Sequence, residues 1–266
     1  MTSMPDPLTG PIPAEIPLPR APLVRVLAQL RFAPIASILK ADFIAPFQEA
    51  IRGEYGILET ELAKSFEIGP AGVVTHPDTT NAWRFFDTTR KWRVTLAADF
   101  LSVETMAYES RADFLARLTR AIIALKQHVN PAVVTRLGVR YVDRVADATR
   151  EDVVALVTSD ALGILGTDIG QRAQFAVVDN LFDIEDGQRL RARWGMLPPR
   201  FTLDPVTIEP LDKPCWVLDL DASLEREQEL DADALSAQSK LMSERVYRFF
   251  RWVVTDEFLR RFGGAV

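Results

Sequence analysis

The sequence has very few residues that bind transition metals or form covalent cross-links. Its 266 residues include one cysteine, Cys215, and two histidines. A single cysteine cannot form an internal disulfide, and the paired spacings typical of zinc sites do not occur, nor does the H-E-x-x-H motif. We therefore predict neither a metal site nor a bound cofactor. Cys215 stands beside Trp216 in an apolar stretch, which indicates a buried structural thiol.

The sequence also lacks an excess of basic residues and any long apolar run. Its formal charge is −6 and its pI is about 5.1, which argues against general binding to nucleic acid. No apolar run approaches the roughly 18 residues that a membrane-spanning helix requires. The first residues do not show a basic region followed by an apolar stretch, the pattern of a secretion signal. These absences predict a cytoplasmic protein that does not bind a membrane.

Catalytic motifs are missing as well. There is no G-x-S-x-G nucleophile motif, and neither histidine has a recognisable nucleophile partner. Gly163, Gly166 and Gly170 match the spacing of neither the dinucleotide-binding motif nor the P-loop, and they follow a helical pattern rather than a strand. We interpret that segment as a connection and predict no catalytic residue.

The composition is that of a globular protein, with 48% hydrophobic and 26% charged residues. Residues 1–22 are different, because they include seven prolines and no periodic apolar pattern. Such a segment favours an extended conformation. We predict an arm that is mobile or lies over the protein's own surface or a partner subunit.

Alternating and helical patterns follow one another along the rest of the chain. They predict a strand over 23–32, a helix over 43–55, an antiparallel meander over 66–106, a helix capped by Ser110, a helix capped by Thr149, a hairpin over 173–197, a strand over 215–222, a long helix after Asp231 and a short helix capped by Thr255. In the meander, residues 92–106 are predicted as one strand whose apolar phase changes near Asp99 and Phe100, which predicts a bulge or a bend. A turn is also predicted at Pro77–Asp78.

This order of elements predicts the α+β class, with antiparallel sheet packed against long amphipathic helices. Strands followed by a long helix occur twice, which suggests two structurally similar halves over 23–150 and 151–266 after the arm of residues 1–22. A single continuous domain is the alternative.

The clearest strand pattern runs from Thr135 to Val145. Leu137, Val139, Tyr141 and Val145 share one face, and arginines occupy the other, at positions 136, 140 and 144. One face therefore belongs to a core, and the other carries a row of cations.

The same stretch carries a family resemblance. Residues 136–144, R-L-G-V-R-Y-V-D-R, resemble the signature strand T-R-x-G-x-R-Y-x-[ND]-R of a bacterial family of similar length that occurs sporadically among genomes. The similarity extends to residues 24–32, 47–51, 83–85, 100–105, 218–221 and 254–258. The family has no assigned activity, so the resemblance implies no reaction. Its sporadic occurrence suits an accessory role near mobile or defence loci.

Charged residues on strand faces are the candidate binding residues. If their strands share a sheet, arginine–aspartate pairs across strands would line a polar surface or groove, or would serve structural pairing alone. Asp219 and Asp221 alternate on one strand, so their carboxylates are about 7 Å apart, a spacing that can hold Mg²⁺ or supply an acid–base pair. The full set is Arg136, Arg140, Arg144, Arg189, Arg191, Arg193, Asp219 and Asp221.

Three functional hypotheses follow. The first is a non-enzymatic binding protein whose partner is another protein or its own copy, and which acts through the arginine face, the arm or the C-terminal helix. The second is a hydrolase or phosphate-handling enzyme that uses Asp219 and Asp221 with arginines as anion clamps. The third is a carrier of a small ligand, with a pocket between the sheet and the C-terminal helix.

Overall fold

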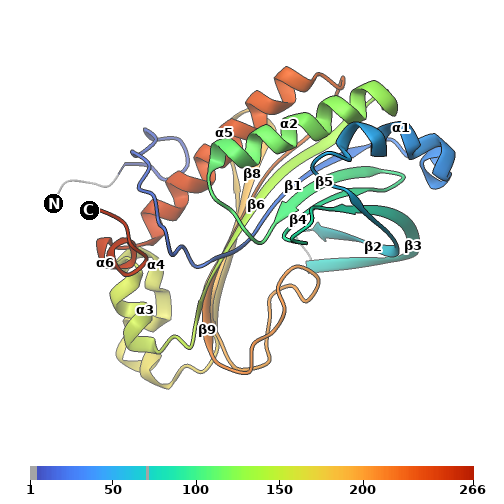
Figure 1. Ribbon diagram of the computed structural model, residues 1–266. Helices are drawn as coiled ribbons and strands as arrows, with labels where there is room; N and C mark the ends of the chain where they lie inside the picture. The colour runs from blue at the N-terminus through green and yellow to red at the C-terminus, as the bar shows by residue number, and fades with distance from the viewer. Residues whose placement is uncertain (1–4, 70–71) are drawn as a thin grey trace. The chain divides into compact units, whose positions relative to one another are not determined.

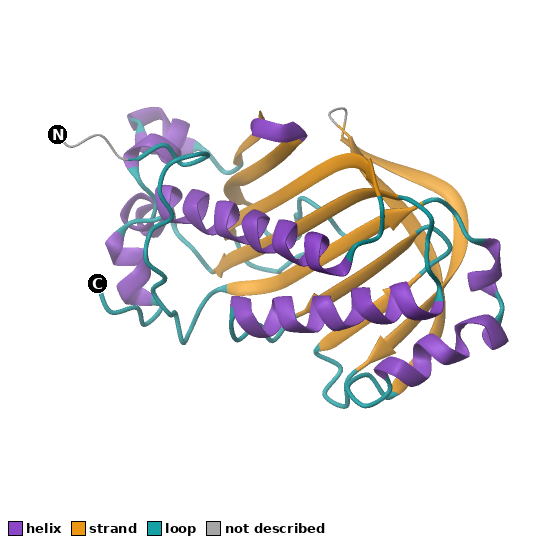
Figure 2. Cartoon of the chain, turned by 90° about the horizontal axis from the view of Figure 1, so that it is seen from above, coloured by secondary structure: helices purple, strands orange, loops and turns teal. Residues whose placement is uncertain are grey.

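The structure, a computed structural model, describes residues 5–69 and 72–266, without the side chains of residues 61–81. Runs of antiparallel strands are separated by helices that pack against the sheet, which confirms the predicted α+β class (Figures 1 and 2). The strands are β1 (Leu23–Phe32), β2 (Ile57–Gly69), β3 (Gly72–Phe86), β4 (Trp92–Leu96), β5 (Phe100–Thr105), β6 (Val134–Ala146), β7 (Ala176–Asp183), β8 (Gln188–Leu197) and β9 (Cys215–Gln228). The α-helices are α1 (Ala41–Ile51), α2 (Arg111–His128), α3 (Arg150–Leu156), α4 (Ser159–Leu162), α5 (Ala232–Val253) and α6 (Asp256–Arg261). Short 3₁₀ helices are η1 (Ala36–Leu39), η2 (Gly163–Gly166), η3 (Asp168–Arg172) and η4 (Glu185–Gly187).

The strands form a nine-stranded sheet among the described residues, in the order β2-β3-β4-β5-β1-β6-β9-β8-β7. The chain divides into two compact units, each assembled from separate segments. One comprises residues 1–25, 140–222 and 242–266, and the other comprises residues 26–139 and 223–241. The division of the chain near residue 150 remains a sequence-based prediction.

The unit of residues 26–139 and 223–241 contains the meander. β2, β3, β4 and β5 pair in sequence, each antiparallel to the next. α2 covers this part of the sheet, where Phe114 stacks on Trp92 with ring centroids 6.0 Å apart. Ser110 begins the helix by accepting a hydrogen bond from the backbone N–H of Asp113, which confirms the predicted cap.

Two details of the predicted meander are wrong. Residues 92–106 form a hairpin rather than one bulged strand, since Leu96 of β4 faces Leu101 of β5 and the Ala97 N–H bonds to the Phe100 carbonyl. The change of apolar phase marked this reversal of direction. The turn predicted at Pro77–Asp78 lies inside β3, and the register of β2 and β3 shifts between Lys64 and Phe66.

The other unit packs helices against β7, β8 and β9. From the second half of α5, Phe249 contacts Trp194 of β8 and Phe182 of β7 with ring centroids 6.0 and 5.6 Å apart. Thr149 and Thr255 cap α3 and α6 as predicted, and Thr149 forms a reciprocal capping box with Asp152. No helix of the described residues is long and apolar enough to cross a membrane.

The N-terminal arm lies along α5 and α6 in this unit, as the blue segment in Figure 1 shows. The Tyr247 hydroxyl accepts a hydrogen bond from the Ile16 N–H at 2.9 Å and donates one to the Ala14 carbonyl at 3.1 Å. The Arg20 N–H bonds to the Phe262 carbonyl at 3.1 Å. The main chain of the arm is therefore hydrogen-bonded to residues of the C-terminal helices.

Gly195 lets β7 and β8 approach closely. Its φ is +154°, and a Cβ at this position would lie 1.9 Å from the carbonyl oxygen of Ala176 in β7. A backbone atom cannot move aside as a flexible side chain can. Gly195→Ala should therefore lower the free energy of unfolding by at least about 2 kcal/mol, by strain and loss of pairing. Urea denaturation measures the effect, and Gly53→Ala is the control, because nothing lies within 4 Å of a Cβ there. Equal stability of the two variants would contradict this account.

Candidate functional site

Three of the predicted charged residues meet on neighbouring strands. Asp219 of β9 lies between Arg140 of β6 and Arg193 of β8, in the sheet order β6-β9-β8. Arg140 grips the carboxylate with two hydrogen bonds, from Nε to Oδ1 at 2.7 Å and from Nη2 to Oδ2 at 2.9 Å. Arg193 donates to Oδ2 from Nε at 3.1 Å and from Nη2 at 2.5 Å. The pattern of alternate residues thus produces arginine–aspartate pairs across three strands.

The loop of residues 198–214 covers this cluster. Asp204 accepts a hydrogen bond from Arg140 Nη1 at 2.8 Å, and the Leu203 carbonyl accepts one from Arg193 Nη1 at 3.4 Å. Apolar residues of the loop pack on the same face of the sheet, where Ile208 joins a buried cluster with Val142 and Val217. The residues Arg140, Arg193 and Asp219 are consequently only 5%, 6% and 2% exposed. The cluster is a covered ion network rather than an open groove.

The charges within the network balance. Burial by itself raises the pKa of Asp219, but the field and the hydrogen bonds of Arg140 and Arg193 outweigh it and leave the pKa below its ordinary value. Asp204 has a lowered pKa because Arg140 and Thr207 likewise outweigh its burial. Two carboxylates therefore face two guanidiniums. Asp219 cannot ligate Mg²⁺ or transfer a proton while both arginines hold it.

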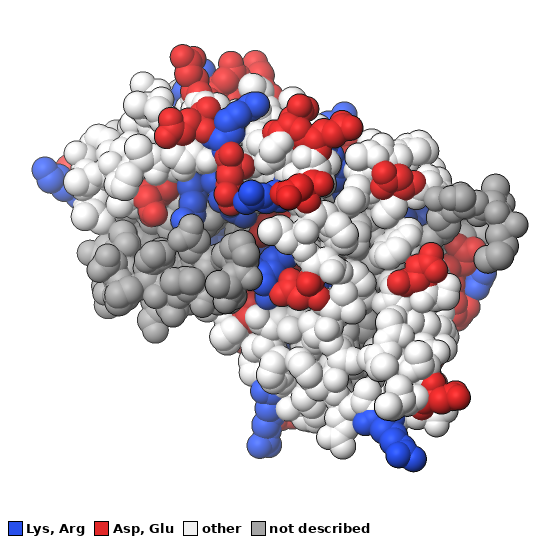
Figure 3. All heavy atoms as spheres, turned by 180° about the vertical axis from the view of Figure 1, so that it is seen from behind, with Lys and Arg blue, Asp and Glu red and all other residues white. Residues whose placement is uncertain are grey.

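The remaining predicted residues form local pairs. Arg191 grips Asp179 of β7 at 3.0 and 2.8 Å, Arg189 contacts Asp183 at 3.1 Å, and Arg144 donates to the Glu209 carbonyl at 2.6 Å. Asp221 is half-buried two residues beyond Asp219. Arg136 belongs to the other unit, where its Nε is 3.8 Å from Glu225. On the face that Figure 3 presents, basic side chains likewise lie beside acidic ones.

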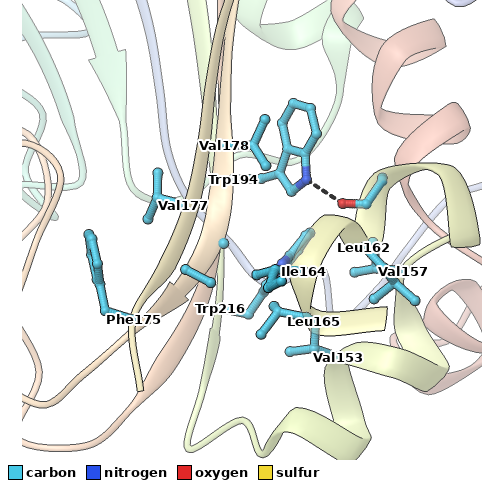
Figure 4. Close-up of a pocket in the computed structure, with 13 residues that line it drawn as sticks. Val153, Val157, Leu162, Ile164, Leu165, Phe175, Val177, Val178, Trp194 and Trp216 are labelled. Carbon is cyan, nitrogen blue, oxygen red and sulfur yellow. Dashed lines mark hydrogen bonds between the residues drawn. The ribbon is translucent and has the colours of Figure 1, made fainter. Parts of the chain in front are cut away.

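An apolar pocket lies at the start of β7. Its volume is about 310 Å³, and it lies between the strands and the helical segment from α3 to η2, rather than against the C-terminal helix. Figure 4 shows Trp216, Val153 and Leu165 on the side of that segment, with Phe175 and Val177 across the strands from them. The Trp194 indole N–H bonds to the Ala161 carbonyl at 2.7 Å, which fixes the helical segment to β8.

The pocket is open to solvent at its rim. Ile164 and Phe175, both of which line it, are 49% and 50% exposed. Phe175 also contacts Phe201 of the covering loop, with ring centroids 5.0 Å apart, and Phe201 is exposed as well. Apolar surface of this kind around a pocket marks binding sites in soluble proteins. The sequence contained no periodic signal for it, because residues 163–172 form short 3₁₀ helices and residues 173–175 are irregular.

β7 is the last strand of the sheet beside this pocket. It pairs with β8 on one side, with Phe182 opposite Leu190 and Asp179 opposite Arg193. The Ile184 N–H donates to the Gln188 carbonyl at 2.7 Å, which marks that position as a hydrogen-bonded pair. Because such pairs alternate in an antiparallel ladder, residues 176, 178, 180 and 182 bond to β8. The N–H and C=O groups of residues 177, 179, 181 and 183 therefore point outward.

Those outward groups have no hydrogen-bond partner in the part of the chain that the structure describes. Leu181, in the middle of the row, is 48% exposed. An edge of this length with free main-chain groups is a template for another strand.

The described residues include no group of three or more histidine, cysteine, aspartate or glutamate side chains placed to hold a metal ion. Cys215 is buried, and burial raises the pKa of its thiol. In comparisons with known proteins, no family model and no curated protein match the chain. The resemblance in residues 136–144 therefore remains a prediction.

Proposed function

We propose that this chain is a non-enzymatic cytoplasmic binding protein, and that the edge of β7 with the adjoining pocket forms its binding surface. The observation that carries the proposal is the row of outward main-chain groups on residues 177, 179, 181 and 183, which ends beside an open apolar pocket. The ligand that suits both features is a protein segment in extended conformation.

The chemistry of the two features is complementary. An added strand would exchange hydrogen bonds with the outward N–H and C=O groups, which supply affinity without regard to side chains. One apolar side chain of that segment would enter the pocket and supply specificity. Burial of a leucine-sized side chain contributes about 1.5–3 kcal/mol. A pocket of about 310 Å³ is near the lower end of the range for small-molecule sites, which favours a side chain over a larger free ligand.

The ion network of Arg140, Arg193, Asp219 and Asp204 positions a loop beside the proposed binding surface. It holds the loop of residues 198–214 against the sheet through Asp204 and Leu203, and that loop carries Phe201 to the rim of the pocket. Its charges are satisfied internally, so it supports the site and is not itself the binding surface.

The test uses affinity purification of the full chain from its native host, with two variants of one residue. Proline at position 181 removes an outward N–H and leaves the hydrogen bonds to β8 in place, because residue 181 is not in a hydrogen-bonded pair with β8. Leu181→Pro should lose the bound protein, whereas Leu181→Ala should retain it. Ile164→Arg, which places a charge at the pocket rim, should lower the recovered amount at least tenfold. Equal recovery of the same protein with all three variants would refute the proposal.

A further inference from the structure

We propose that the strand which adds to β7 is β7 of a second copy of this chain, in a two-fold arrangement centred on Asn180. This inference rests on the proposed function, because it names the occupant of the same edge. It is argued from the register that the side chains of β7 permit.

A two-fold axis perpendicular to the sheet keeps each face of the sheet continuous across the two copies. Residues whose N–H and C=O groups point outward must then pair with residues of the second copy whose N–H and C=O groups also point outward. Odd-numbered residues of β7 therefore face odd-numbered residues. Two such registers overlap over most of the strand, one joining residues 176–182 and the other joining residues 177–183. They are centred on Asp179 and on Asn180, respectively.

Charge distinguishes the two registers. The register centred on Asp179 places this aspartate directly opposite its own copy, and like charges directly opposite each other destabilise a strand pair. The register centred on Asn180 places Asp179 opposite Leu181 and Val177 opposite Asp183. No two acidic residues of β7 then face each other, and the four outward positions of each strand form four hydrogen-bonded pairs.

The even-numbered residues of β7, whose side chains lie on the other face of the sheet, also fit the register centred on Asn180. Asn180 meets Asn180 of the second copy, and two amide side chains can exchange hydrogen bonds. Phe182 of one copy lies opposite Val178 of the other, and Ile184 lies opposite Ala176. Val178 and Ala176 both line the pocket. Phe182 packs on Phe249 of its own copy, whereas the half-buried Ile184 lies next to the pocket of the second copy and gives the pocket an apolar occupant.

Single cysteines along β7 test this register. Residue 180 would form a non-hydrogen-bonded pair with its own copy, with Cα atoms about 4.5 Å apart, a distance that a disulfide spans. Asn180→Cys should therefore cross-link to a covalent dimer under mild oxidation of the full chain. Asp179→Cys and Leu181→Cys are matched controls that should remain mostly monomeric on a non-reducing gel. The native Cys215 is buried and does not interfere.

Each outcome decides the proposal. Cross-linking of Asn180→Cys that exceeds both controls at least fivefold supports it. Preferential cross-linking of Asp179→Cys or Leu181→Cys overturns the register, and absence of cross-linking in all three overturns the second copy as occupant. In that last case the proposed function still stands if Leu181→Pro loses a different protein in the purification, and it fails if Leu181→Pro loses nothing.

Discussion

Asp219→Ala should lower the free energy of unfolding by about 3–5 kcal/mol, because it leaves two buried guanidiniums without their shared carboxylate. Arg140 and Arg193 are nearly inaccessible to water, so solvent cannot replace the lost interactions. Arg140 would keep Asp204, while Arg193 would keep the Leu203 carbonyl. The loop of residues 198–214 should loosen as well as the sheet.

Urea denaturation and limited proteolysis measure both consequences. The control is Asp212→Ala, which removes a carboxylate 3.0 Å from Arg200, where both residues belong to the loop of residues 198–214. Both partners of that pair are about 85% exposed, and exposed pairs contribute at most about 1 kcal/mol. Proteolysis within 198–214 should accelerate in Asp219→Ala and change little in Asp212→Ala. A similar small loss in both variants would show that the buried network does not hold the loop.

Asp143→Asn should stabilise the protein at alkaline pH. Asp143 of β6 is 6% exposed on the apolar face of the strand, and burial raises the pKa of its carboxyl from the ordinary 3.8 to about 7. The folded state therefore retains a proton between about pH 4 and 7 that the unfolded state releases. Stability should fall as pH rises through that window.

The size of this change in stability follows from the pKa shift of Asp143. A pKa difference of this size corresponds to on the order of 4 kcal/mol between the two ends of the window. Asparagine stays neutral, so Asp143→Asn should match the wild type near pH 4 and exceed its stability at pH 8 by up to that amount. Urea denaturation at both pH values measures the difference. Asp168→Asn, at an exposed aspartate, is the control variant. An Asp143→Asn stability change that is the same at pH 4 and pH 8 would contradict this explanation.

The sequence predicted the elements whose signal is local. Helix caps at Ser110, Thr149 and Thr255 depend on one side chain and the backbone a few residues away, and all three are confirmed. The apolar stripe of α5 repeats within that helix, and the alternation of apolar and polar residues in β6, β8 and β9 repeats within each strand. These patterns are therefore local signals as well. The α+β class followed from them.

The sequence did not predict the features that depend on distant segments. Alternation places Arg193 opposite the apolar residues of β8, but its burial comes from the loop of residues 198–214, which has no periodic pattern. The role of Asp204 could have been suspected from the local turn, since its carboxylate accepts from the Val206 and Thr207 N–H groups. The same alternation rule places Asp143 on the core face, and this signal was available in the sequence. The pocket could not be foreseen, because it forms where turns from 163–175 meet β7 and β8.

The most direct test of the central claim is the native mass of the assembly that the full chain forms in its host, measured for Leu181→Pro and Leu181→Ala side by side. The alanine variant should carry a bound protein chain, which we expect to be a second copy. The proline variant, which lacks one outward N–H of β7, should have the mass of a single chain. If the proline variant retains the same assembly as the alanine variant, the edge of β7 is not the binding surface.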